Sequence, residues 1–414
     1  MSTSHRPVTA GASGLVAHGY GWLPNLRRRS GAQAVRFRLT GQRVLALSGP
    51  DAVRFFYDDN HIRRAGALPE PVQSTLFGRG AVHTLDGELH RHRKAMFMSL
   101  MTGAGIDRLV GHATTAWDEV FDPGRRHSAV VLFDEAARIL TRAVCRWAGV
   151  SLAPGDVAPL AADLVALVDG FGTLGPRHWR ARRARQRRER WLADLVDQVR
   201  DGVLDVPEES ACVAVARHRA TNGELLPPRV AAVELLNVLR PTVAVCWYVM
   251  FAAHALHRWP AQRARLRAGD PGYAEAFAHE VRRFYPFAPF VGGRAVTDLT
   301  WQGESVPAGA LVLLDLYGQN HDPQLWPEPY VFDPTRFHDR EPGAVDLVPQ
   351  GGGSPYTGHR CPGEAITVAL LAAFADRLAR LGYVVPEQDL GIPLHRIPTR
   401  VRSGFVLVPH AGGE

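Results

Sequence analysis

The chain has 414 residues, a formal net charge of +7 and a composition that is 46% hydrophobic and 21% charged, as in ordinary soluble globular proteins. Its four cysteines, at positions 145, 212, 246 and 361, form no C-x-x-C pair, which argues against structural zinc and a disulfide framework. Residues 1–30 lack the apolar core of a signal peptide and no apolar run reaches membrane-spanning length, so we expect a cytoplasmic protein without membrane insertion.

The N-terminal part of the chain predicts a small β-rich part followed by helices. Residues 35–47 alternate enough to indicate two short strands joined at Gly41-Gln42. The start signal at residues 49–51 predicts a helix to about residue 57. Residues 81–87 predict a strand-like or loop entry to a helix that carries the basic side chains His90, His92, Arg93 and Lys94. This cluster is either a solvated basic face or a site for anionic groups.

The middle of the chain predicts further helices. Residues 129–168 indicate helices with one break at residues 153–155, after which Asp156 caps the next helix. The arginine run from residue 177 to residue 190 suits an amphipathic helix with a solvated outer face. Its density is also typical of a channel mouth that attracts carboxylates, or of a nucleic-acid surface. Residues 205–223 predict a loop with one short helix.

The longest apolar helix is predicted over residues 230–247 and contains an Arg240-Pro241 pair. An arginine in an apolar helix keeps its charge and is costly to bury unpaired. Pro241 removes a helix hydrogen bond, so we expect a kink beside Arg240. Because no acidic residue lies within one helical turn, the pair predicts a cavity with a fixed cation that takes a carboxylate ligand in a bidentate contact. The alternative is an arginine that pairs with a distant acidic side chain.

The C-terminal third of the chain holds a series of short motifs. Glu280 and Arg283 form an E-x-x-R pattern, which places both on one helix face where they pair. Residues 303–309, which contain V-P-A-G, are interpreted as the turn region of a two-stranded hairpin. An N-H-D-P turn at residues 320–323 follows, and then a P-T-R-F segment that contains Arg336.

The last motif is a glycine-rich loop, Q-G-G-G-S-P-Y-T-G-H-R-C-P-G-E, from Gln350 to Glu364. It places Cys361 directly before a helix predicted over roughly residues 364–381, with Pro362 suited to the first turn. The unpaired N–H groups at a helix start favour a thiolate, and a thiolate is a good axial ligand for haem iron. Taken alone, a single cysteine of this kind is more often a buried residue beside a turn.

This order of motifs resembles the cytochrome P450 superfamily of haem-thiolate enzymes over most of the chain. The resemblance implies one domain over residues 1–414, mainly α-helical with a small β-rich part, and haem b with Cys361 as the iron ligand. The superfamily usually has Phe seven residues before this cysteine and Arg two before it, where this chain has Ser354 and His359, with Arg360 next to the ligand. The loop sequence and the arginine-proline pair are instead similar to the bacterial fatty-acid peroxygenase branch.

The resemblance also implies roles for individual residues. An ion-pair triad behind the haem is expected from Glu280, Arg283 and Arg336. Contacts to the haem, beyond Cys361, are expected from Arg64, His90, Lys94, Gln350 and His359. An apolar channel for the fatty-acid chain is expected from Leu68, Leu76, Phe77, Val168, Phe171, Phe287 and Phe290, although such a set is also typical of plain core.

Arg240, Pro241 and His83 are the expected catalytic residues. In this branch the position of His83 overlooks the distal face of the haem; it is glutamine in hydroxylating members and histidine in the alkene-forming type. The run L-F-G-R-G-A-V-H-T that ends at Thr84 is similar to the alkene-forming type. Histidine, unlike glutamine, donates or accepts a proton near neutral pH.

The sequence therefore predicts a hydrogen-peroxide-dependent enzyme that oxidises long-chain fatty acids at Cα and Cβ, by hydroxylation and by decarboxylation to terminal alkenes. Its expected partners are a fatty acid and hydrogen peroxide, without an obligate redox partner or nucleic acid. One alternative is a P450 monooxygenase that acts on a carboxylic acid and depends on a reductase. The other is a non-catalytic haem protein or a basic nucleic-acid binder, for which no recognisable fold accompanies the arginine run.

Overall fold

The computed structural model describes residues 12–39, 41–122, 128–173 and 175–410. Helices dominate these residues, as the resemblance implies. They are α1 (Ala12–His18), α2 (Trp22–Ser30), α3 (Pro50–Phe56), α4 (Glu70–Val72), α5 (Gly87–Leu100), α6 (Gly103–Val120), α7 (Leu132–Ala148), α8 (Val157–Asp169), α9 (Pro176–Arg200), α10 (Ala211–Arg217), α11 (Pro228–Val243), α12 (Val245–Arg258), α13 (Pro260–Ala268), α14 (Tyr273–Phe284), α15 (Leu316–Asn320) and α16 (Glu364–Arg380).

The largest sheet has five strands in the order β1-β2-β8-β5-β3. Only the β2–β8 pair of this sheet is parallel. The strands of the structure are β1 (Val35–Leu39), β2 (Gln42–Leu47), β3 (Ile62–Arg63), β4 (Val130–Val131), β5 (Phe290–Ala295), β6 (Leu299–Trp301), β7 (Glu304–Val306), β8 (Leu311–Asp315), β9 (Tyr383–Val384) and β10 (Val406–Pro409). The two strands predicted within residues 35–47 are therefore confirmed.

The hairpin of β6 and β7 turns earlier than predicted. Its turn residues are Gln302 and Gly303, both with positive φ, which is the backbone of a tight two-residue hairpin turn. Residues 304–306, expected within the turn region, form β7 instead, and Gly309 belongs to the next turn, before β8. The expectation for residues 303–309 was wrong in this respect because the glycine nearer to β6 closes the hairpin.

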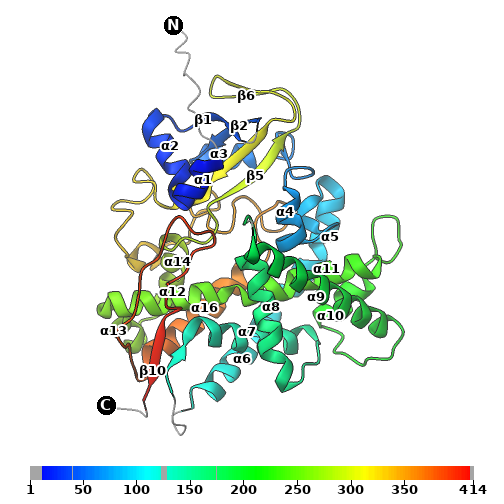
Figure 1. Cartoon of the computed structure of the whole chain (residues 1–414), viewed down its shortest axis with the longest axis vertical. Helices are drawn as coiled ribbons and strands as arrows, with labels where there is room; N and C mark the ends of the chain where they lie inside the picture. The colour runs from blue at the N-terminus through cyan, green and yellow to red at the C-terminus, as the bar shows by residue number, and fades with distance from the viewer. Residues whose placement is uncertain (1–11, 40, 123–127, 174, 411–414) are drawn as a thin grey trace.

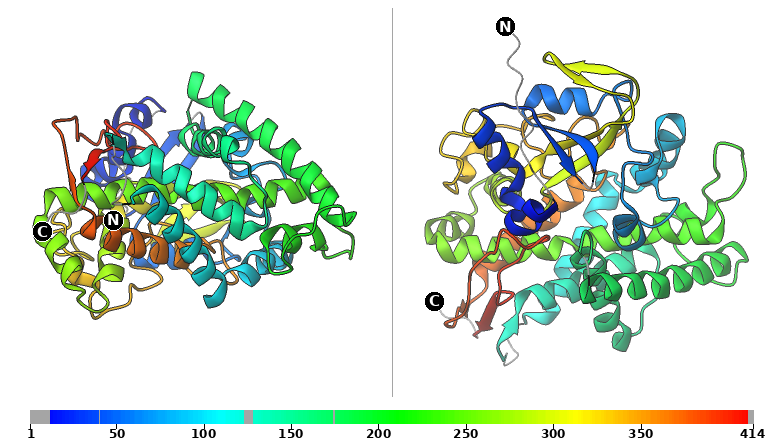
Figure 2. Two further views of the ribbon diagram at one scale, coloured as in Figure 1. Left: turned by 90° about the horizontal axis from the view of Figure 1, so that it is seen from below. Right: turned by 45° about the horizontal axis from the view of Figure 1, so that its top comes forward.

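The sheet and the N-terminal helices α1–α3 lie together at one end of the molecule, and the long helices fill the rest (Figure 1). Two further views show the same division (Figure 2). The largest apolar core joins α6, α7, α8, α9, α11, α12 and α16. In the sequence, the cysteine loop follows β8 of the sheet and directly precedes α16 of the helical part.

Helices α11 and α12 form one 31-residue stretch, from Pro228 to Arg258, through the middle of the molecule. The stretch is long and apolar enough to span a membrane, so the expectation that no run reaches this length was wrong. However, 94% of its most apolar window is buried inside the protein, as in a core helix. α11 continues past Pro241 and ends at Val243, so the expected interruption falls three residues after the proline, at Ala244.

Candidate active site

Cys361 ends the glycine-rich loop and precedes α16. Its N–H donates to the carbonyl of Gln350 at 3.1 Å, and the side-chain Nε2 of Gln350 lies 3.6 Å from the cysteine Sγ. Gln350 is held in turn by Thr367, whose Oγ1 is 3.0 Å from Nε2, and by Arg282, whose Nε donates to Oε1 at 3.1 Å. One amide therefore joins the candidate iron ligand to two helices.

The thiol of Cys361 does not become a thiolate through the helix start alone. Burial, and then the neighbouring Glu364 carboxylate, raise its pKa above the usual value. A backbone hydrogen bond from Gly363 at the start of α16 lowers this pKa, as do Lys94 and Gln350 to a smaller extent. The helix start thus acts in the predicted direction, and a bound metal cation would stabilise the deprotonated sulfur further.

The loop before Cys361 passes very close to α3 and the residue that follows it. A Cβ on Gly352 would lie 2.4 Å from Cγ1 of Val53, and one on Gly351 would lie 2.5 Å from the hydroxyl of Tyr57. Gly351 also has a backbone φ of 93°, which residues other than glycine rarely adopt. Two of the loop glycines are therefore required by this close approach.

Basic side chains gather beside the loop, in a cluster that we call the cation cluster and define as Arg64, His90, Lys94 and His359. The His90 and His359 rings stack with their centroids 3.8 Å apart. The Nε2 of His359 lies 3.5 Å from the Asp86 carboxylate. Lys94, the only lysine of the chain, donates to the carbonyls of Gly358 and Arg360. His90, Lys94 and Arg64 are all buried, so a solvated basic face is not what these residues form.

The residues present fit a haem. After burial, Arg240, His359, Lys94 and His90 each lower the pKa of His83, so these side chains lie within electrostatic range of it. The Cys361 thiolate also raises the pKa of Arg240, which places the thiol within electrostatic range of it. One sulfur ligand, with the cations Arg64 and Lys94 and the hydrogen-bonding rings of His90 and His359 beside it for two carboxylates, is the donor set that a haem and its propionates need.

Glu280, Arg283 and Arg336 lie together as an ion-pair cluster. Two parallel bonds of 2.7 Å join Glu280 to Arg283, and both side chains have no exposed surface. The Nε of Arg336 lies 3.8 Å from the same carboxylate. Arg283 also donates to three backbone carbonyls, those of Asn320, Pro329 and Val331, and so fastens the segment before the cysteine loop to α14.

Arg240 is 6% exposed and lies on α11. Its Nη2 donates to Oδ1 of Asn237 at 3.2 Å, and its buried Nε has no hydrogen-bond partner among the described residues. Within the described part of the chain no ion pair joins Arg240 to an acidic side chain, so the alternative of a distant acidic partner is not observed. Burial lowers the pKa of Arg240 to about 9, and the group remains charged at neutral pH.

His83 lies on the short 3-10 helix Val82–Thr84, and its ring packs on Phe77 with the centroids 4.2 Å apart. The buried Nδ1 has no hydrogen-bond partner in the described structure. Burial, followed by the nearby cations, lowers the pKa of His83 well below its ordinary value. The imidazole is therefore neutral at pH 7, which differs from the expectation that its protonation changes near neutral pH.

The residues expected along the chain channel fall in different places. Val168 is buried in the largest core, and Leu76 and Phe287 pack against that core while remaining partly exposed. Leu68 and Phe171 are also partly exposed. Phe290 differs, because its ring packs on Trp22 with a centroid distance of 5.9 Å, in a separate cluster near β1. The contact with Trp22 thus places Phe290 in the cluster near β1 and not with the other residues expected along the chain channel.

Several residues of this site were missed in the sequence. Glu234 and Arg93 form a buried ion pair of 2.9 Å, and Asn237 lies between Glu234 and Arg240. The signal for Glu234 was a lone acidic residue on an apolar helix, which requires a partner. Its partner Arg93 was recognised only as one of the basic side chains of α5, without an indication that it pairs with Glu234. Arg282 was likewise missed, although it follows Glu280 by two residues within the E-x-x-R motif.

The arginine run on α9 is mostly paired within the protein. Arg185 is buried and donates to the carbonyls of Thr75 and Leu76 and to Glu189. Arg187 and Arg188 both bind Asp163. A purely solvated face is therefore wrong for Arg185, which holds the segment before Phe77.

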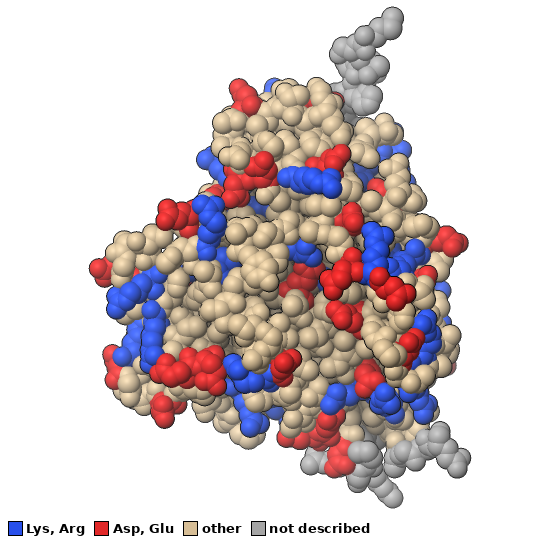
Figure 3. All heavy atoms as spheres, turned by 180° about the vertical axis from the view of Figure 1, so that it is seen from behind, with Lys and Arg blue, Asp and Glu red and all other residues tan. Residues whose placement is uncertain are grey.

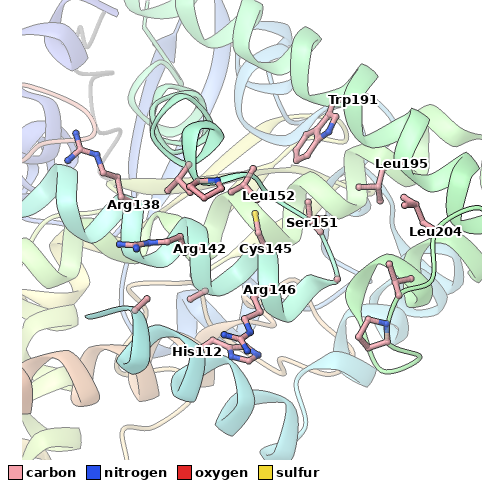
Figure 4. A pocket seen from close by; sticks show the side chains of 18 of the residues that line it. His112, Arg138, Arg142, Cys145, Arg146, Ser151, Leu152, Trp191, Leu195 and Leu204 are labelled. Atoms are coloured by element: carbon pink, nitrogen blue, oxygen red, sulfur yellow. The ribbon is translucent and has the colours of Figure 1, made fainter. Parts of the chain in front are cut away.

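A cavity of about 1030 Å³ lies elsewhere, between α6, α7, α8 and α9 (Figure 4). Its lining includes neither Cys361 nor Arg240, so it is distinct from the site above. Arginines and acidic side chains balance along its wall; they are Arg138, Arg142, Arg146, Glu119, Asp194 and Asp205. This balance favours neither an anion nor a cation.

Comparisons with known proteins agree with this geometry. The cytochrome P450 family model matches residues 271–374. The structure of cytochrome P450EX alpha (CYP152N1) with myristic acid is 40% identical, with a TM-score of 0.93 over 97% of this chain and 99% of that one. Cytochrome P450SP alpha (CYP152B1) with (R)-ibuprophen is 43% identical, with a TM-score of 0.93 over 96% and 98%.

Two further matches are more distant. A variant of cytochrome P450 OleT in complex with arachidonic acid is 35% identical, with a TM-score of 0.93 over 97% and 98% of the two chains. Human cytochrome P450 4A11 is 33% identical over 141 residues, which are 33% of this chain and 26% of that protein. The aligned region thus spans about a quarter of the length of this curated relative.

Proposed function

This chain belongs to the cytochrome P450 family, and we propose that it is a haem-thiolate enzyme that oxidises long-chain fatty acids with hydrogen peroxide. The observation that supports this most is Arg240, a buried guanidinium with no acidic partner among the described residues. Two neighbours, P450EX alpha and OleT, are named as complexes with fatty acids, and a fatty acid brings the carboxylate that Arg240 lacks.

The cofactor in this proposal is haem b. Cys361 would ligate the iron, and the cation cluster would hold the propionates, with the Glu280 triad behind. When bound, a haem with a thiolate ligand supplies the redox chemistry that activates hydrogen peroxide. Gln350 donates toward the sulfur and thereby limits its electron donation.

In this proposal the substrate carboxylate bound by Arg240 carries out the proton transfer. Two N–H groups of the guanidinium bind the fatty-acid carboxylate, because a bidentate charge-assisted contact is the strongest that arginine makes. One carboxylate oxygen then accepts a proton from one oxygen of hydrogen peroxide and returns it to the other. Docking the headgroup in this way leaves Cα and Cβ as the carbons nearest the reaction centre, so oxidation occurs there.

Two products follow from removal of hydrogen at Cβ. Hydroxylation converts the fatty acid and hydrogen peroxide into a hydroxy acid and water. Decarboxylation converts the same reactants into a terminal alkene, carbon dioxide and two molecules of water. The neutral His83, with its Nδ1 free of a partner, favours a substantial share of decarboxylation in this proposal.

The test is an incubation of the haem-loaded protein with a saturated long-chain fatty acid and hydrogen peroxide, without a reductase, followed by gas chromatography. We expect hydroxy acids and a terminal alkene one carbon shorter. Products that form only with a reductase and NAD(P)H would instead establish the redox-partner-dependent monooxygenase. Absence of product under both conditions would overturn the enzymatic proposal.

Nucleic-acid binding is not favoured. The arginines of α9 are largely engaged by Asp163, Asp169, Glu189 and backbone carbonyls. On the face seen in Figure 3, basic and acidic side chains are interspersed and form no extended basic surface. We also propose a cytoplasmic location, because all four cysteines are unpaired and the long apolar helix is buried.

A further inference from the structure

A buried glutamate lies behind Arg240 on α11. Glu234 has no exposed surface, and its Oε1 accepts hydrogen bonds from the N–H of Val82 at 2.8 Å and from Nη1 of Arg93 at 2.9 Å. Its Oε2 accepts from Nδ2 of Asn237 at 3.3 Å. The charge of Glu234 is thus balanced by Arg93 of α5, and it does not neutralise Arg240.

Asn237 connects Glu234 to Arg240, since it lies three residues from each on the same helix. Its Nδ2 also donates to the carbonyl of Phe77 at 2.9 Å, and its Oδ1 accepts from Nη2 of Arg240 at 3.2 Å. Two acceptors therefore face the NH₂ group and a cation faces the oxygen. This arrangement leaves the amide only one favourable orientation.

We propose that Glu234 is a positioning residue that orients the Arg240 guanidinium, through Asn237, for a docked fatty-acid carboxylate. The inference rests on the proposed function of Arg240 and adds a residue to it. Because Glu234 also holds the N–H of Val82 and Asn237 holds the carbonyl of Phe77, the same pair fixes the segment that carries His83. Glu234 acts through these contacts and not on the reacting atoms.

The chemistry of a Glu234→Gln variant follows from the hydrogen bonds. Glutamine offers one oxygen, which still accepts from Val82, and an NH₂ group where Asn237 requires an acceptor. The Asn237 amide then faces an NH₂ group on one side and the Phe77 carbonyl on the other, so its single favourable orientation is lost. The fold keeps its packing, because glutamine and glutamate have nearly the same shape, while the guanidinium loses its fixed orientation.

The experiment measures the affinity of haem-loaded protein for myristic acid by isothermal titration calorimetry, in a double-mutant cycle of Glu234→Gln and Asn237→Ala. The matched control is Asp163→Asn, which removes another nearly buried acid that pairs with Arg187 and Arg188 and not with Arg240. We expect each of the two single variants to bind about tenfold more weakly. The double variant should be no weaker than the single variants, since both act along one path.

The alternative outcomes are distinct. If Glu234→Gln binds myristic acid as tightly as the Asp163→Asn control, or if the two losses multiply to about a hundredfold, the positioning role is wrong. If the unaltered protein itself does not bind myristic acid, the proposed function fails and the inference falls with it. The expected signature is that Glu234→Gln weakens binding in the otherwise unaltered protein and has no further effect once Asn237→Ala is present.

Discussion

The guanidinium carbon of Arg240 lies 5.7 Å from the centre of the Phe77 ring. The same ring packs on His83, 4.2 Å away, so one aromatic side chain contacts both residues expected to act on the substrate. An aromatic ring attracts a cation only weakly compared with a carboxylate. The contact with Phe77 therefore competes only weakly with a carboxylate for Arg240.

Replacing His83 by Gln is expected to lower the alkene share of the products and raise the hydroxy-acid share, while fatty-acid binding is retained. The reason is that the neutral imidazole presents a ring nitrogen without a partner among the described residues, whereas glutamine replaces the ring with an amide. Gas chromatography of the products measures the ratio. His92→Gln, on an exposed side chain of α5, is the control. An unchanged ratio in the His83 variant would remove its assigned role.

Replacing Glu280 by Ala is expected to destabilise the protein by about 3–5 kcal/mol, because it leaves the buried Arg283 and the partly exposed Arg336 without their counter-ion. Urea unfolding of the haem-loaded protein measures this change. The control is Glu208→Ala, which removes an exposed ion pair with Arg217 and should change stability by less than about 1 kcal/mol. Equal effects of the two variants would mean that the cluster is not structural.

Replacing Gln350 by Leu is expected to lower the reduction potential of the bound haem, with the Cys361 ligand retained. The Nε2 donor, 3.6 Å from the sulfur, withdraws charge from it, and its loss makes the sulfur a stronger electron donor. A spectroelectrochemical titration gives the potential. A potential that stays the same or rises would show that Gln350 does not act on the sulfur.

Acidification is expected to destabilise the protein through His254. Burial lowers the pKa of His254 to about 4, and its Nδ1 lies 2.7 Å from the Tyr285 hydroxyl. A histidine whose pKa is lower in the folded than in the unfolded protein makes its full contribution to folded-state stability above the unfolded pKa of about 6.5. This contribution is lost as the pH falls toward the folded pKa of about 4. Melting temperatures between pH 7 and pH 4 should therefore fall less steeply in a His254→Gln variant, and parallel curves would contradict this.

The sequence predicted those features that depend on local spacing. Glu280 and Arg283 are three residues apart on one helix, so their pairing follows from helix geometry alone. Arg240 was recognisable because a charge in an apolar helix requires an explanation. The strands near residue 40 followed from alternation and a glycine turn.

Features that depend on distant segments were beyond the sequence. Arg93 and Glu234 are 141 residues apart, and no local pattern indicates that they meet. The burial of Cys361, which raises the pKa of its thiol, was likewise beyond the sequence because burial depends on the whole surrounding structure. The turn of the β6–β7 hairpin was misplaced because two glycines compete for it and only the strand pairing decides.

The most direct measurement is the rate of peroxide-driven fatty-acid oxidation, without a reductase, by the unaltered protein and by an Arg240→Ala variant that binds haem normally. The control is Arg183→Ala, on an exposed side chain of α9. We predict that kcat/KM falls by at least about a hundredfold in the Arg240 variant and stays unchanged in the control, because in the proposed function Arg240 binds the substrate carboxylate and Arg183 does not. Oxidation at an undiminished rate in the Arg240 variant would contradict carboxylate docking on Arg240.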